Sequence, residues 1–377
     1  MGEKTKEKRG GLRRIFAAGL TLILIALAVL AFLFRDSLGG DGVRRALGRE
    51  GEDVLAAGEP FSFEMGSSQV FALAGEGLAI ASATGLQLLD AEGYTVAKQV
   101  FSLETPAVAT SPVLSAFYDV GGTALHVARP NGVCESLPTE GAIISVTVSE
   151  SGYLAVSTEL TGYKGLVRVY NSELTLLYEW YSRTGYLLLA RVTPDGRGMV
   201  ASSVTTAGSV LHFFSLEREE EQARYVAQDE LLLEFDFLSD GRMAAVSGER
   251  LLLLDSAGAV TGTYDFGDMY LTDYRISGDF AALFLCRYRS GNAGMLVCVG
   301  SGGDVLGTLE LQRDLLGLST AGRRLLALYS DGLVLYTQEL EELMTYADTL
   351  AVKAALLRTR GGALLISGYG ADLLAVP

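Results

Sequence analysis

The stretch that decides the fold is SDGRMAAVS, Ser239 to Ser247, followed by LLLLDSAG, Leu251 to Gly258. A Ser-Asp-Gly turn leads into a short apolar run, and a second apolar run ends in another turn rich in Asp, Ser and Gly. Short apolar runs between such turns are typical of buried β-strands, because an amphipathic helix would show a 3.6-residue period over a longer stretch. Glycine supplies the positive φ that tight hairpin turns require. This stretch therefore predicts a β-hairpin.

The same hairpin pattern recurs along the chain from about Pro60 onward. The turn and its following strand return as SESGYLAVS (Ser149 to Ser157), TPDGRGMVAS (Thr193 to Ser202), SGDFAALF (Ser277 to Phe284), TAGRRLLAL (Thr320 to Leu328) and TRGGALLIS (Thr359 to Ser367). The second apolar strand returns eight times, anchored at Leu86, Leu125, Leu166, Val210, Leu251, Leu296, Leu333 and Leu373. These anchors lie 37 to 45 residues apart, 41 on average. A period near 40 residues with about four strands per unit is typical of a β-propeller.

The repeat count predicts an all-β propeller of about eight four-stranded blades. A seven-bladed ring is the alternative, because the second repeat, SPVLSAFYDVGG, lacks the turn signature. The last repeat supplies only three strands before Pro377, while the strand PFSFEMG, Pro60 to Gly66, precedes the first repeat. Pairing that strand with the last blade would close the ring and cover two exposed sheet edges.

The composition agrees with a folded ring of strands. Hydrophobic residues make up 49% of the chain, which excludes a disordered protein. The 45 glycines among 377 residues fit the many turns. Strands that are buried on both faces need no polar alternation, so runs such as Leu251 to Leu254 are expected in a propeller.

The N-terminus has a different character. Residues 1–14 contain six basic and two acidic side chains, a net charge of +4. The whole chain carries −15, so the remainder carries −19. Residues 15–34, IFAAGLTLILIALAVLAFLF, hold no charge, and twenty residues of helix span the roughly 30 Å hydrocarbon core of a bilayer. By the positive-inside rule, residues 1–14 form a cytoplasmic tail and the acidic part faces the exterior.

A cleaved signal peptide is the rival interpretation of this segment. Its apolar core would be shorter and would end at a small-x-small site, which the exit through Phe34, Arg35 and Asp36 does not offer. No cysteine follows closely, which argues against a lipoprotein. We therefore expect an uncleaved transmembrane helix at 15–34, a flexible glycine-rich linker at 35–58 and an extracytoplasmic propeller at 59–377.

The sequence lacks recognisable catalytic and ligand motifs. It contains no nucleophile elbow, phosphate-binding loop, dinucleotide fingerprint, zinc-protease pair or calcium loop. We accordingly assign no catalytic, cofactor-binding or metal residue and expect no cofactor. The two histidines, His126 and His212, have apolar neighbours in sequence and are interpreted as packed within the propeller. A catalytic site assembled from scattered carboxylates stays open.

Two candidate features remain. Cys286 and Cys298 flank the turn RSGNAG, and a hairpin centred on Asn292 would place them opposite one another, so a cross-strand disulfide is a hypothesis beside two buried thiols. Tyr178 and Trp180, the only tryptophan, share one face of an outer strand of the third blade. They could bind a partner or stack on a sugar, or they could pack against the next blade.

The repeats resemble the WD40 and PQQ-like propeller superfamilies, although they lack the Trp-Asp dipeptide and the recurrent tryptophan motif. The layout of basic tail, single span and degenerate propeller is similar to uncharacterised single-span bacterial envelope proteins. This resemblance concerns fold and location and carries over no functional residue.

Together these features predict a binding scaffold anchored in the cell membrane. Its partner would be a protein or an envelope polymer, not nucleic acid, which a charge of −19 would repel. A propeller enzyme, a lyase or hydrolase that uses carboxylates of the central channel, is the alternative. A sensor is a weaker possibility, since fourteen cytoplasmic residues are too few for a signalling domain.

Overall fold

The computed structural model describes residues 61–64, 66–288, 294–368 and 370–377. The predicted cytoplasmic tail, transmembrane helix and linker (1–14, 15–34 and 35–58) lie outside the described residues. Within the described ranges there is no helix with the length and apolar character needed to cross a membrane.

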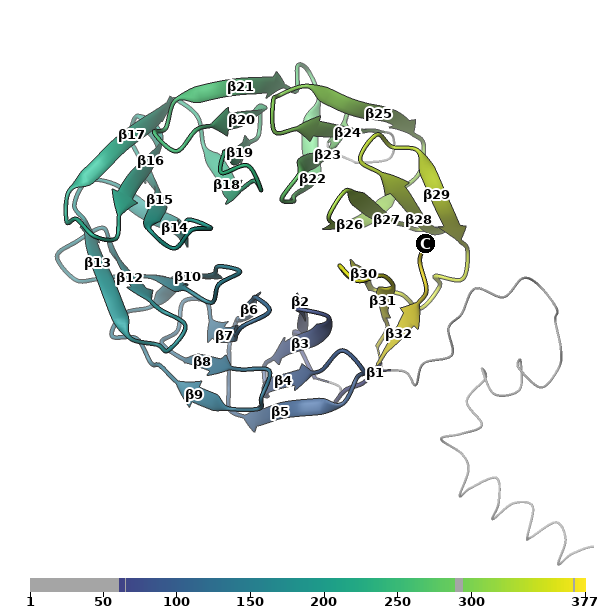
Figure 1. The fold of residues 1–377 in the computed structure, drawn as a ribbon, viewed down its shortest axis with the longest axis horizontal. Coiled ribbons are helices and arrows are strands. Elements are labelled where there is room, and N and C mark those ends of the chain that lie inside the picture. The colour runs from purple at the N-terminus through teal and green to yellow at the C-terminus, as the bar shows by residue number, and fades with distance from the viewer. Residues whose placement is uncertain (1–60, 65, 289–293, 369) are drawn as a thin grey trace, which may run out of the picture. The chain divides into compact units, whose positions relative to one another are not determined.

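The described strands form eight antiparallel sheets of four strands, which stand as blades around a central axis (Figure 1). Within a blade the strands follow one another from the inside outward. Blade 1 comprises β2 (Val70–Ala74), β3 (Gly77–Ser82), β4 (Gly85–Leu89) and β5 (Thr95–Val100). Blade 2 comprises β6 (Pro106–Thr110), β7 (Ser115–Asp119), β8 (Leu125–Ala128) and β9 (Cys134–Ser136). Blade 3 comprises β10 (Ile143–Val148), β11 (Leu154–Thr158), β12 (Gly165–Tyr170) and β13 (Leu176–Ser182). Blade 4 comprises β14 (Tyr186–Val192), β15 (Gly198–Thr205), β16 (Gly208–Ser215) and β17 (Glu221–Gln228).

The second half of the ring repeats this arrangement. Blade 5 comprises β18 (Leu232–Phe237), β19 (Met243–Ser247), β20 (Arg250–Leu254) and β21 (Val260–Asp265). Blade 6 comprises β22 (Tyr270–Ile276), β23 (Phe280–Cys286), β24 (Gly294–Gly300) and β25 (Val305–Leu311). Blade 7 comprises β26 (Leu315–Ala321), β27 (Arg324–Tyr329), β28 (Gly332–Thr337) and β29 (Glu342–Tyr346). Blade 8 comprises β30 (Ala354–Leu357), β31 (Ala363–Ile366), β32 (Gly370–Leu374) and β1 (Phe61–Ser62).

This arrangement confirms the eight-bladed prediction and rejects the seven-bladed alternative. All eight predicted anchor residues lie on the third strand of their blades, from Leu86 on β4 to Leu373 on β32. The second repeat, which lacks the turn signature, still forms a complete blade with the shortest outer strand of the first seven.

The ring is closed between its first and last blades, as the leftover strands predict. Phe61 pairs with Ala371 and Ser62 with Gly370, so the earliest described strand completes blade 8. An ion pair strengthens the junction, because Nε of Arg358 lies 3.0 Å from a carboxylate oxygen of Glu76 on the β2–β3 turn of blade 1. Both side chains are at most 14% exposed.

The core lies between neighbouring blades, and each middle strand contributes to it with both faces. All seven residues of β23 are buried. Phe280, Ala282 and Phe284 pack with blade 7, whereas Ala281, Leu283 and Leu285 pack with blade 5. This two-sided burial explains why the strands read as continuous apolar runs.

Of the two alternatives for Cys286 and Cys298, the structure favours two buried thiols over the hypothetical disulfide. Cys286 lies opposite Gly294, and Cys298 lies opposite Ala282, four positions away along the hairpin. At about 3.4 Å per residue the two cysteines are ~14 Å apart along the strands. A disulfide needs Cα atoms within about 7 Å, and the two residues are not bonded to one another.

Candidate functional site

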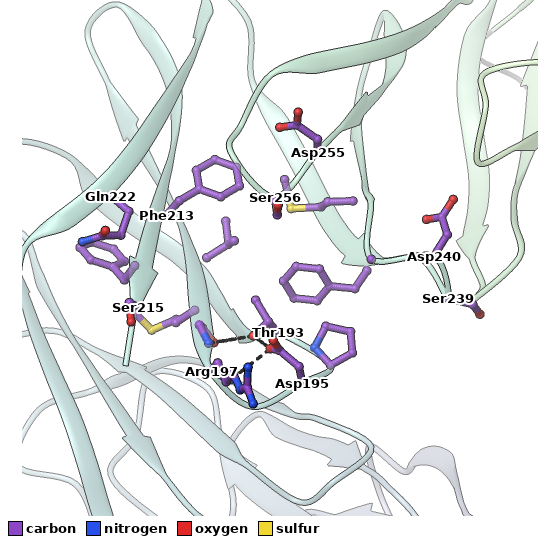
Figure 2. A pocket seen from close by; sticks show the side chains of 18 residues that line it. Thr193, Asp195, Arg197, Phe213, Ser215, Gln222, Ser239, Asp240, Asp255 and Ser256 are labelled. Atoms are coloured by element: carbon purple, nitrogen blue, oxygen red, sulfur yellow. Dashed lines mark hydrogen bonds between the residues drawn. The ribbon is translucent and has the colours of Figure 1, made fainter. Parts of the chain in front are cut away.

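A groove of about 570 Å³ lies between blades 4 and 5 (Figure 2). Its edges are the β14–β15 turn, the β18–β19 turn and the β20–β21 turn. Because consecutive strands are antiparallel, these turns all lie on one face of the ring. We call the cavity and these three turns the groove.

The floor of the groove is apolar. Val200, Phe213, Phe237 and Met243 line it and belong to the hydrophobic cluster between blades 4 and 5. Gly258 permits this close approach of the two blades. It has φ of +78°, and a Cβ there would lie 2.9 Å from the ring of Phe213. A larger residue at this turn would therefore push into the floor.

The rim of the groove is acidic. Asp195, Asp240 and Asp255 line it, and each carboxylate accepts hydrogen bonds from its own turn. The Thr193 hydroxyl and the Arg197 N–H hold the pKa of Asp195 below its usual value. Burial raises the pKa of Asp240, but hydrogen bonds from Arg242 and Ser301 outweigh burial, and the pKa is lowered. These two carboxylates thus stay charged at neutral pH.

A second cavity, of about 380 Å³, adjoins the groove on the side of the ring axis. It shares Pro194, Phe237 and Ser239 with the groove, so the two form one continuous surface. It is lined from the inner strands of several blades, among them β10, β14 and β18. We call it the axial cavity.

Arg191 and Asp236 line the axial cavity and belong to a charged network. Arg191 on β14 donates from Nη2 to Glu234 over 2.7 Å, and its Nη1 lies 3.2 Å from Asp236. The hydroxyl of Tyr274 on β22 donates to the other oxygen of Glu234 over 3.0 Å. Burial raises the pKa of Asp236, and the charge of Arg191 only partly opposes this. The network therefore links three blades at the axis.

The histidines do not join this network. His126 on β8 stacks on Phe101, with ring centroids 3.7 Å apart and planes 12° from parallel. His212 on β16 is 3% exposed and lies beside Trp180, 4.9 Å between ring centroids. Both are packed within the propeller, as the sequence indicates. The axial carboxylates consequently lack a neighbouring histidine that could act as acid or base.

One hydrogen-bonded chain was not predicted. His212 Nε2 lies 2.8 Å from the Ser203 hydroxyl, and its Nδ1 lies 3.0 Å from a carboxylate oxygen of Glu221. Serine, histidine and an acid in this order resemble a hydrolase nucleophile, base and orienting group. However, Ser203 is fully buried, so no substrate can reach its hydroxyl. Burial lowers the pKa of His212, and the chain serves to tie β15, β16 and β17 together.

Tyr178 and Trp180 lie together on β13, on the face that meets blade 4. Tyr178 is 7% exposed and Trp180 is half-buried. Their ring centroids lie 6.1 and 4.9 Å from that of Phe214. The packing interpretation is thus confirmed for Tyr178, while partner binding by Trp180 stays a prediction.

No metal site accompanies these features: in the ranges that the structure describes, no three His, Cys, Asp or Glu side chains group closely enough to hold an ion. The sequence did not predict the groove. Its signal was available in the Asp-Gly pairs Asp195-Gly196 and Asp240-Gly241, which mark two of its turns and which sequence alone explains as turn chemistry.

The fold and the site define an eight-bladed β-propeller with an apolar, acidic-rimmed groove. The chain belongs to a family of unknown function, DUF5711, whose match covers residues 62–272. No curated protein matches the chain.

Solved structures show the same fold at low sequence identity. The C-terminal WD40 domain of Sif2 aligns with a TM-score of 0.63 and 10% identity, covering 87% of this chain and 100% of that domain. BamB from Moraxella catarrhalis aligns with a TM-score of 0.57 and 11% identity, covering 84% and 98%. A chain of the mitotic checkpoint complex aligns with a TM-score of 0.50 and 13% identity, covering 71% and 86%. The chain is therefore similar to both WD40 and BamB propellers in fold.

Proposed function

We propose that this protein is a non-enzymatic binding scaffold, anchored in the cell membrane by residues 15–34, whose extracytoplasmic propeller binds a segment of a partner protein in the groove. The observation that carries this proposal is the continuous surface formed by the groove and the axial cavity. It combines an apolar floor, an acidic rim and a charged network without an adjacent histidine.

The floor suits an apolar anchor of a partner. Phe213 and Met243 are at most 5% exposed because they pack in the cluster between blades 4 and 5. A large side chain that enters the groove therefore meets a surface that this packing holds in place. Buried aromatic or aliphatic anchors in such pockets contribute most of the affinity of protein interfaces. The similar chain in the mitotic checkpoint complex belongs to a protein assembly, which supports a protein partner here.

The rim suits basic residues beside that anchor. Three carboxylates line the groove, and Arg197 is its one basic lining residue among those described. The net charge of −19 beyond Phe34 adds attraction for a basic partner and repulsion of nucleic acid. We therefore expect the partner segment to carry an apolar anchor flanked by Lys or Arg.

Site-specific photo-crosslinking in intact cells tests the proposal. A benzophenone amino acid replaces Ser256 in the β20–β21 turn of the groove or, as a matched control, Asn131 in the β8–β9 turn on the same face of blade 2. We expect a discrete crosslinked protein from position 256 and none from position 131. Asp195→Asn with Asp255→Asn should weaken that crosslink, since both changes remove charge and keep a hydrogen-bond acceptor. Equal products from both positions, or none, would contradict a partner in the groove.

A further inference from the structure

A third cavity lies at the boundary of blades 3 and 4, on the face opposite the groove. It measures about 550 Å³ and is lined by the β11–β12 loop of blade 3 and by the loops that enter β10 and β14. Loops of this kind alternate with the groove's turns along antiparallel strands, so they emerge at the other end of each blade. Tyr163 and Tyr186 line it, and Tyr181 packs on Tyr163; we call these three residues the tyrosine platform.

The rings of the tyrosine platform are exposed although their positions are constrained. Tyr186 is 63% exposed, and Tyr163 and Tyr181 are 39% exposed each. The rings of Tyr163 and Tyr181 pack at 5.1 Å between centroids, tilted by 49°. Lys164 donates from Nζ to the Tyr186 hydroxyl over 2.8 Å and lies 4.3 Å from the centre of its ring. These contacts fix the positions of the three rings before any ligand binds.

The main chain and neighbouring side chains support this arrangement. The Lys164 N–H donates to the carbonyl of Ser182 over 2.8 Å, which joins the β11–β12 loop to the end of β13. The Tyr181 hydroxyl donates to Glu179 over 3.2 Å, and Glu179 accepts in turn from Nε of Arg168 over 2.7 Å. Large rigid rings that lose little side-chain freedom on binding are efficient recognition groups.

The cavity beside the platform has a mixed lining in which polar groups predominate. Glu140, Glu159, Thr161 and Lys164 line it together with the hydroxyl-bearing rings of Tyr163 and Tyr186. It therefore offers both donors and acceptors around flat aromatic faces. Two carboxylates against one ammonium disfavour a polyanion, and the mixture of polar groups with Ile144, Leu160 and Leu187 suits a ligand that carries both hydroxyls and C–H faces.

We infer that the tyrosine platform binds an uncharged glycan built of pyranose rings. The weakly positive C–H face of a sugar ring complements the negative face of an aromatic ring, as an aromatic edge does. The sugar hydroxyls both donate and accept hydrogen bonds, which matches carboxylate, ammonium and tyrosine groups in one cavity. A volume of about 550 Å³ accommodates one or two sugar rings. The site is separate from the groove, so it adds a second ligand to the proposed scaffold.

Calorimetric titration of the full-length chain with defined glycans tests the inference. The probes are the N-acetylglucosamine tetramer and the β-1,4-glucose tetramer, raised to about 10 mM because a single carbohydrate site often has millimolar affinity, near −4 kcal/mol. Tyr186→Ala should weaken binding of at least one glycan by about tenfold, the effect of one lost aromatic contact. Tyr186→Phe keeps the ring and should retain affinity within about threefold.

The matched control is Tyr94→Ala, which removes a tyrosine that is 67% exposed on the β4–β5 turn of blade 1. It should leave glycan affinity unchanged. Far-UV circular dichroism establishes that each variant is folded. Three results would overturn the inference: no binding of either glycan, equal losses in Tyr186→Ala and Tyr94→Ala, or binding of a decaproline peptide in preference to both glycans. Loss of glycan binding would leave the crosslink from position 256 intact, so the two proposals fail separately.

Discussion

Replacing Phe61 by alanine should open the junction that closes the ring. Among the described residues β1 forms two backbone pairs with β32, so side-chain packing contributes much of its attachment to blade 8. Phe61 is 2% exposed and belongs to a cluster that includes Leu78 and Ile80 of blade 1 and Leu364 and Ile366 of blade 8. One ring thus fills the space between the first and last blades.

The expected cost follows from this burial. A buried Phe→Ala change removes about 3 to 5 kcal/mol, including the cavity it leaves. Unfolding entropy of about 2.1 cal/mol/K per residue, applied to residues 61–377, is roughly 0.7 kcal/mol/K. The melting temperature should therefore fall by about 5 to 7 °C. Unfolding should begin at this junction, because no other pair of strands in the part of the chain that the structure describes has so short a ladder.

Scanning calorimetry of the purified full-length chain measures this change. The matched control is Val100→Ala on the outer strand β5, where the side chain is 81% exposed. Its melting temperature should move by less than about 1 °C, as for most surface changes. A Phe61→Ala variant that melts within that margin of the wild type would refute the reasoning, since β1 could then contribute little to blade 8.

Two further predictions concern polar groups. Burial holds the pKa of His212 below its usual value, so the unfolded chain binds more protons and the folded state loses stability as the pH falls below about 6.5 toward the lowered folded pKa. His212→Gln should flatten this part of the melting-temperature profile, and a stability difference between the two proteins that does not vary with pH would contradict the assignment. Glu76→Gln should destabilise the ring by about 3 kcal/mol by leaving Arg358 buried without its charge partner. Asp331→Asn breaks the exposed pair with Arg313 and should change the denaturant midpoint little. Equal effects of the two substitutions would argue against a stabilising role of the Glu76–Arg358 ion pair.

The architecture could be predicted from sequence because one physical condition repeats. The third strands of blades 1, 5 and 7 are largely buried on both faces, so residues such as Leu86, Leu251 and Leu333 recur with a period that turn lengths vary only slightly. The unpaired strands at the two ends of the repeat array likewise indicate closure, since an eight-bladed ring with one incomplete blade would expose two edges.

Register and inter-blade contacts could not be predicted in the same way. The cysteine hypothesis placed the centre of the β23–β24 hairpin at Asn292, but the pairing of Cys286 with Gly294 places it two residues earlier. A two-residue error in a turn moves both partners, so opposite residues become distant ones. The chain of Ser203, His212 and Glu221 was missed for a related reason: their nine-residue spacing gains meaning only when three strands are in register.

The groove and the tyrosine platform depend on two blades at once. Phe213 reads in sequence as one more apolar residue of a strand, and Gly258 as one more turn glycine. These two residues meet across the boundary of blades 4 and 5. Phe213 lies in the floor of the groove, and Gly258 leaves room for its ring. Tyr163 and Tyr186 are likewise 23 residues apart and belong to different repeats. The repeat period of the sequence identifies equivalent positions in successive blades. The two candidate binding sites instead depend on residues that differ from one blade to the next.

Closure by β1 also has a consequence in time. The strand is synthesised first, but its partner β32 emerges about 310 residues later, which takes about 15 to 60 s at 5 to 20 residues per second. During that interval Phe61 has no partner on blade 8, and seven blades can form without a sealed ring. The last event of folding would then join the first and the last of the described strands. Until β1 pairs with β32, the nascent chain exposes two sheet edges. Another copy of the chain could pair with these edges, so a longer delay before closure increases the risk of aggregation.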